Sequence, residues 1–110
     1  MIHIMLSLDL KNADEQRDDL YKKLRAVNFI KVDGVDTVWV LPMNVSNTQQ
    51  RIDELAGSIH EILRSTVEKL DIQRISYVLQ MGNTPPTRIV VEKVRGIYKV
   101  NEFDPAVNAA

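Results

Sequence analysis

The chain has 110 residues, a formal net charge of −1 and a hydrophobic content of 45%. This length and composition predict one folded domain and exclude a disordered chain, and the near-neutral charge lacks the basic excess of a dedicated duplex binder. The absence of cysteine excludes a disulfide framework, a thiolate zinc site and a cysteine nucleophile. With no basic leader before an apolar run and no run near the ~20 residues that span a bilayer, we expect a cytoplasmic protein that does not enter a membrane.

The first element is an apolar strand over residues 2–8 that runs into Asp9. A helix is then predicted from Asn12, which can cap it, with Glu15 completing a capping box. Apolar residues at helical spacing continue this helix to about Asn28.

A hairpin is predicted next, because Asp33-Gly34 separates two runs rich in β-formers, residues 29–32 and 35–41. Pro42 is expected to end the second of these strands. A long amphipathic helix should follow, starting at Ser46 or Asn47 and continuing to about residue 70.

The last third of the chain reads as strands. Residues 72–81 alternate as a fourth strand, Gly82 to Pro86 break it, and residues 88–94 form a fifth. Gly96 predicts a bulge or turn before residues 97–100, and the tail over residues 101–110 is expected to be frayed. Residues 1–84 are thus assigned to the core, and residues 85–110 to a C-terminal strand extension and tail of the same domain.

The order strand, helix, strand, strand, helix, strand is that of a split βαβ repeat. The expected fold is therefore α+β: a ferredoxin-like βαββαβ sandwich with a four-stranded antiparallel sheet, two helices on one face and a C-terminal fifth strand. The extra strand has two interpretations, pairing with a second subunit or folding back onto its own sheet edge. We predict a homodimer, with Trp39, Ile89 and Val91 as interface residues.

Asp9 is the first candidate for chemistry, since a strand end presents its side chain at the rim of the sheet. In a symmetric dimer two such carboxylates can meet and hold Mg²⁺ or Mn²⁺, which can activate water or stabilise phosphoryl displacement. The alternative is structural, because an aspartate between a strand and a helix commonly forms a turn or a cap.

Strand alternation places His3, Met5, Ser7 and Asp9 on one half-polar face, open to solvent, a subunit or a ligand. His60, beside Glu61 and away from the apolar stripe of its helix, is predicted to be solvated. Trp39 is interpreted as a packing residue, in the core or at a dimer interface, rather than as a base-stacking one.

Residues 85–100 carry four cations and one carboxylate. This basic strip is compatible with RNA or DNA, but a charged edge strand that resists aggregation is the commoner cause of such a strip.

Leu8-Asp9-Leu10, Arg17 in an amphipathic helix, Phe29 and Val38-Trp39-Val40 together resemble the small CRISPR-associated protein of spacer adaptation. Related ferredoxin-fold families are the virulence-associated ribonuclease toxins and a GhoS-type ribonuclease antitoxin. The resemblance implies a dimer that cleaves RNA or DNA with a divalent metal, with Asp9 as catalytic metal ligand and Arg17 as a phosphate contact. The chain departs from the pattern in the acidic residues Asp18 and Asp19.

Two functions are therefore predicted. The first is a dimeric, metal-dependent nuclease centred on Asp9. The second is a non-catalytic module, such as an antitoxin, inhibitor or assembly protein, which binds a protein partner through its open sheet face and edge strands.

Overall fold

The computed structural model describes residues 1–11 and 13–106. They form an α+β structure, which confirms the predicted class, with two helices and a six-stranded antiparallel sheet in the order β2-β3-β1-β4-β5-β6. The elements are β1 (Ile2–Lys11), α1 (Arg17–Ala26), β2 (Ile30–Lys31), β3 (Val38–Met43), α2 (Gln49–Lys69), β4 (Arg74–Met81), β5 (Thr87–Val94) and β6 (Ile97–Phe103). Neither helix is both long enough and apolar enough to cross a membrane.

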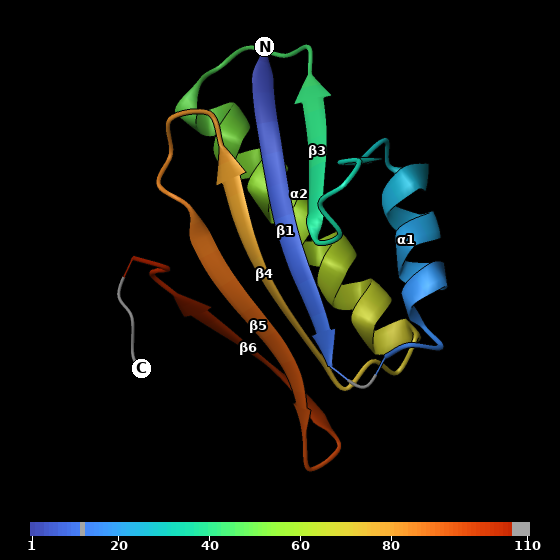
Figure 1. The fold of residues 1–110 in the computed structure, drawn as a ribbon. Helices are drawn as coiled ribbons and strands as arrows, with labels where there is room; N and C mark the ends of the chain where they lie inside the picture. The colour runs from blue at the N-terminus through green and yellow to red at the C-terminus, as the bar shows by residue number, and fades with distance from the viewer. Residues whose placement is uncertain (12, 107–110) are drawn as a thin grey trace.

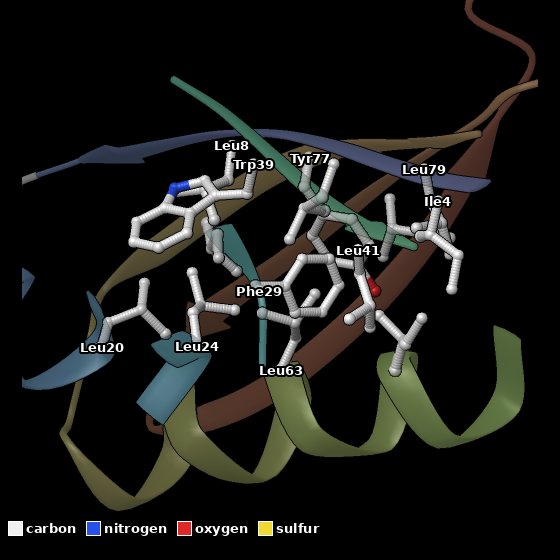
Figure 2. Close-up of a cluster of buried hydrophobic side chains, with 14 of the residues drawn as sticks. Ile4, Leu8, Leu20, Leu24, Phe29, Trp39, Leu41, Leu63, Tyr77 and Leu79 are labelled. Carbon is white, nitrogen blue, oxygen red and sulfur yellow. The ribbon is translucent and has the colours of Figure 1, made fainter. Parts of the chain in front are cut away.

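Both helices pack on the same face of the sheet, and the other face is open (Figure 1). The alternation along β1 explains this arrangement, because every second residue from Ile2 to Leu8 is buried while the intervening residues are exposed or half-exposed. Leu20 and Leu24 of α1 and Leu63 of α2 meet the buried side of the sheet (Figure 2). The single core therefore lies between the sheet and the helix layer.

β1 is the central strand. It pairs with β3 on one side, with Leu6 opposite Trp39, and with β4 on the other, with Leu6 opposite Leu79. Residues that face each other across antiparallel strands share a side of the sheet, so these registers carry the apolar side of β1 onto both neighbours.

The C-terminal extension contains two strands rather than the single strand predicted. β5 pairs with β4, and β6 pairs with β5 around a two-residue turn formed by Arg95 and Gly96. The φ angles of these residues are +53° and +80°, as a type I′ turn requires. β6 continues to Phe103 through residues expected to be frayed, because ladder pairing with β5 satisfies the backbone groups of Asn101 and Phe103. Residues 107–110 of the predicted tail lie outside the described residues.

The helix starts differ from the predicted ones. Asn12, the predicted cap of the first helix, lies outside the described residues, and α1 begins only at Arg17, where the preceding Gln16 makes no side-chain cap. For α2, the hydroxyl of Thr48 accepts a hydrogen bond from the backbone N–H of Arg51 (3.2 Å), so this residue is the cap instead of Ser46 or Asn47.

Pro42 does not end β3, which continues to Met43. The reason is the shortness of β2, whose two residues pair only with Trp39 and Val40. Beyond Val40 the outer side of β3 has no strand among the described residues, so a residue without an N–H group is tolerated there.

Candidate functional site

Asp9 lies on the open face of the sheet, near the C-terminal end of β1, and is exposed. Its partner across the ladder is Ser76 of β4, and the next residue on the same face, Lys11, is opposite Arg74. The open position predicted for this side chain from strand alternation thus agrees with the structure.

Cations surround Asp9. The end of the open face forms a pocket of ≈ 310 Å³ lined by Asp9, Leu10, Lys11, Arg74, Ser76 and Arg88. Arg88 reaches it from β5, where it is opposite Val78. Three adjacent strands thus contribute three positive side chains and one carboxylate to the lining of this pocket, which we call the cationic pocket.

Two of the cations are oriented by neighbours. The Nε of Arg88 donates a hydrogen bond to the hydroxyl of Ser76 (3.3 Å), and its guanidinium lies 5.0 Å from the ring centroid of Phe103. The Nε of Arg74 lies 3.7 Å from a carboxylate oxygen of Glu92 on β5. Within residues 1–11 and 13–106, no ion pair shorter than 4 Å involves Asp9 or Lys11.

The charge balance of the cationic pocket favours an anionic ligand. Three cations and one carboxylate line it, and Glu92 pairs with one of these cations, Arg74, so one positive charge remains in excess. Cations close together repel a divalent metal ion. Arg and Lys side chains are the usual ligands of phosphate groups, and Arg adds directional hydrogen bonds. In the part of the chain that the structure describes, no group of three or more histidine or acidic side chains is arranged to hold a metal ion.

No family model, curated protein or solved structure matches the chain. The functional assignment therefore depends on the residues of this chain alone.

Arg17, the predicted phosphate contact, does not line the cationic pocket that contains Asp9. It is the first residue of α1, in the helix layer on the face of the sheet opposite to the open one. Its Nη2 lies 3.6 Å from the Oδ1 of Asp14. The cations that do lie beside Asp9 come from β1, β4 and β5. The sequence alone predicts that Arg74 and Arg88 lie on strands. It does not predict which strands are neighbours in the sheet.

The three predicted interface residues lie in the core of the chain. Trp39 is fully buried beneath the helix layer, with Tyr21 packed against it edge-to-face (ring centroids 5.0 Å apart) and the guanidinium of Arg25 5.4 Å from its ring. Ile89 and Val91 face the helices because β5 pairs with β4 of its own chain, opposite Tyr77 and Ile75. None of the three presents a surface to a second subunit.

His60 is not solvated as predicted. Its side chain extends from α2 towards the sheet and is half-buried, with the Nδ1 atom 2.6 Å from the hydroxyl oxygen of Tyr77 on β4. Burial lowers the pKa of His60, opposed in part by the carboxylate of Glu102, and burial raises the pKa of Tyr77. Both shifts favour the neutral forms of the two side chains at neutral pH, and the tautomer of the imidazole decides which of them donates the hydrogen bond.

A second pocket of ≈ 340 Å³ adjoins this pair, between α2 and the C-terminal hairpin. Its lining includes Gly57, Arg64 and Val100 beside the His60–Tyr77 pair.

The contact between His60 and Tyr77 could have been predicted from the sequence. Tyr77 stands at a buried position of an alternating strand, so its hydroxyl needs a polar partner from the covering helix.

The far end of the open face is apolar. A pocket of ≈ 760 Å³ there is lined in part by Met1, Met5, Ile30 and Val40. Met5 and Ile30 are 48% and 57% exposed, which is high for apolar side chains on a sheet. The open face is thus divided along β1 into an apolar end and a cationic end.

Proposed function

We propose that this chain is a non-catalytic binding module whose open sheet face holds the phosphodiester backbone of a single-stranded nucleic acid. The observation that carries the proposal is the cationic pocket, in which Lys11, Arg74 and Arg88 from three strands surround Asp9. An open sheet face with basic side chains and an exposed aromatic ring, here that of Phe103, is a surface on which an unpaired strand can lie.

The order β4-β1-β3-β2, with both helices on one face, supports the ferredoxin-like interpretation for residues 2–81. In that interpretation β5 and β6 extend the sheet beyond the four-stranded core and add Arg88 and Phe103 to the binding face. The overall charge of −1 sets a limit on affinity, and we expect dissociation constants in the micromolar range at physiological salt.

A metal-dependent nuclease centred on Asp9 is the less supported function. Its metal would have to bind beside three cations, with a single carboxylate from each chain. The two functions make opposite predictions for Asp9→Asn: removal of the carboxylate abolishes cleavage by a nuclease, whereas it strengthens anion binding because one repulsive charge is lost.

The test is fluorescence anisotropy with labelled single-stranded RNA, single-stranded DNA and duplex DNA, titrated at several salt concentrations. Lys11→Gln and Arg88→Gln should each weaken single-strand binding and reduce the slope of log affinity against log salt by about 0.7. Arg17→Gln is the matched control, because it removes the same charge from the helix layer and should leave binding unchanged.

Each other outcome has a defined meaning. Failure of every nucleic acid to bind at low salt would refute the proposal. Equal losses in Arg17→Gln and Arg88→Gln would show that binding follows overall charge rather than the cationic pocket. Cleavage that requires Mg²⁺ or Mn²⁺ and disappears in Asp9→Asn would establish the nuclease instead.

A protein partner is the second candidate function, and the apolar end of the open face favours it. Exposed Met5 and Ile30 beside a ≈ 760 Å³ pocket form the kind of surface that proteins use to bind one another. Met5→Lys, which places a charge at the centre of this apolar surface, should abolish capture of a protein partner, whereas nucleic-acid binding should be retained or strengthened because the open face gains a cation.

A further inference from the structure

β6 is an edge strand whose outer backbone groups can be identified from the turn that precedes it. In a two-residue hairpin the residues flanking the turn, here Val94 and Ile97, form a hydrogen-bonded pair. Because such pairs alternate along an antiparallel ladder, Tyr98, Val100 and Glu102 direct their N–H and C=O groups away from β5. The backbone of Lys93 supports this pattern. Its N–H donates to the carbonyl oxygen of Gln73, on the β4 side (2.9 Å), instead of to Tyr98, which lies opposite on β6.

This outer edge is accessible along the described residues, since β6 ends the strand order of the sheet. It is also unusually apolar for an edge, with Ile97, Val100 and Phe103 exposed by 65%, 51% and 45%. Long apolar edges pair readily with other strands, and proteins generally protect them. An edge of this kind can accept a partner strand.

The sequence of β6 is complementary to itself when two copies run antiparallel with the symmetry axis at Val100. Every residue whose backbone groups point away from β5 is then opposite another such residue of the second copy. Tyr98 lies opposite Glu102, and Val100 lies opposite Val100 of the second copy. On the open face Ile97 lies opposite Phe103, so the two most terminal apolar side chains cover each other. Lys99 lies opposite Asn101, so no two like charges face each other.

Neighbouring registers are worse. Moving the axis to Lys99 places two ammonium groups opposite each other, and moving it to Asn101 leaves Ile97 without its apolar partner and shortens the ladder. The central register therefore uses all three pairs of outward backbone groups and avoids charge repulsion.

We propose that two copies of this chain associate through β6, antiparallel and with Val100 on the two-fold axis, to form one continuous twelve-stranded sheet. The six strands of each chain keep their own pairing, so no strand is exchanged. This inference rests on the edge strand and does not depend on nucleic-acid binding.

The dimer should be weak, because one strand pair buries much less than the ~1,600 Å² of a standard interface. Sedimentation velocity should show a mass that rises from 12.6 kDa towards twice that value as concentration increases through about 10 μM. A chain that stays monomeric to several hundred micromolar, or that dimerises with unchanged affinity after Val100→Pro, would overturn the proposal.

Val100→Pro removes the central outward N–H and should weaken the dimer roughly tenfold or more, since an outward N–H is not needed within the chain. Val100→Thr keeps the N–H and the branched side chain and serves as the matched control, with little change in affinity. Circular dichroism establishes that both variants fold.

Cysteine trapping tests the register independently of the proline variant, in a chain that has no cysteine of its own. Hydrogen-bonded antiparallel pairs place Cα atoms about 5.5 Å apart, which a disulfide can span. Val100→Cys should therefore form a covalent dimer in a glutathione buffer, while Lys99→Cys and Asn101→Cys should not. Trapping at residue 99 or 101 instead, or at none of the three, would refute the central register.

Discussion

Replacement of Trp39 should destabilise the chain in proportion to how much of the indole is removed. The side chain is fully buried between β3 and α1, opposite Leu6 on the neighbouring strand. Loss of a large aromatic core residue costs about 3–5 kcal/mol, and the edge-to-face contact with Tyr21 accounts for about 1 kcal/mol of that. We therefore expect Trp39→Ala to lower the free energy of unfolding by about 3–5 kcal/mol.

Trp39→Phe should cost much less, about 1–2 kcal/mol, for a specific reason. The indole Nε1 is buried and has no hydrogen-bond acceptor among the described residues, so its N–H already carries a desolvation penalty that phenylalanine removes. Phenylalanine also keeps an aromatic ring beside Tyr21 and beneath the guanidinium of Arg25.

The assay is urea unfolding followed by circular dichroism, because Trp39 is the only tryptophan and the variants lose its fluorescence. With a slope near 1.5 kcal/mol/M, Trp39→Ala should move the midpoint by about 2–3 M. A loss below about 1 kcal/mol together with impaired dimerisation would place Trp39 at a subunit interface and refute the core assignment. Equal losses in both variants would show that a phenyl ring restores none of the packing of the indole, and would contradict the expected graded loss.

Two further predictions concern α2. Because burial lowers the pKa of His60 from its ordinary 6.5, the unfolded chain binds more protons than the folded one just below that pH, so stability should fall as pH decreases from 7.5 to 5. His60→Gln should lose less stability over this range in urea unfolding, and an identical pH dependence would contradict the assignment. Thr48→Ala should lower the free energy of unfolding by about 1 kcal/mol through loss of the cap to Arg51, whereas Ser46→Ala should change it by less than about 0.5 kcal/mol. Equal effects of the two alanine variants would place the cap elsewhere.

The α+β class and most of the helices and strands were predictable because their signals are local. Alternation in residues 2–8 gives the two faces of β1, and apolar spacing gives α2, without knowledge of distant residues. The sixth strand was not predicted because all of its residues except Tyr98 are exposed, so residues 97–103 carry no alternating burial pattern and ladder pairing with β5 orders them.

The candidate site was predictable only in part. The exposure of Asp9 follows from strand parity, but its cationic neighbours depend on the pairing of β1 with β4 and of β4 with β5. Arg74 and Arg88 are separated from Asp9 by most of the chain, and no local pattern links them. The His60–Tyr77 contact is equally non-local, since it joins a helix face to a strand whose register only the folded structure defines.

The central position of β1 has a consequence for how the chain is made. This strand leaves the ribosome before its two neighbours, and its pairing with β4, from Ile4 to Met81, needs most of the chain to be present. Until then an apolar strand has one unpaired edge in a nascent protein, which is a condition that favours aggregation. Such non-local pairing also slows folding, so synthesis rate and chaperone binding should affect the yield of this protein more than that of a helical domain of equal length.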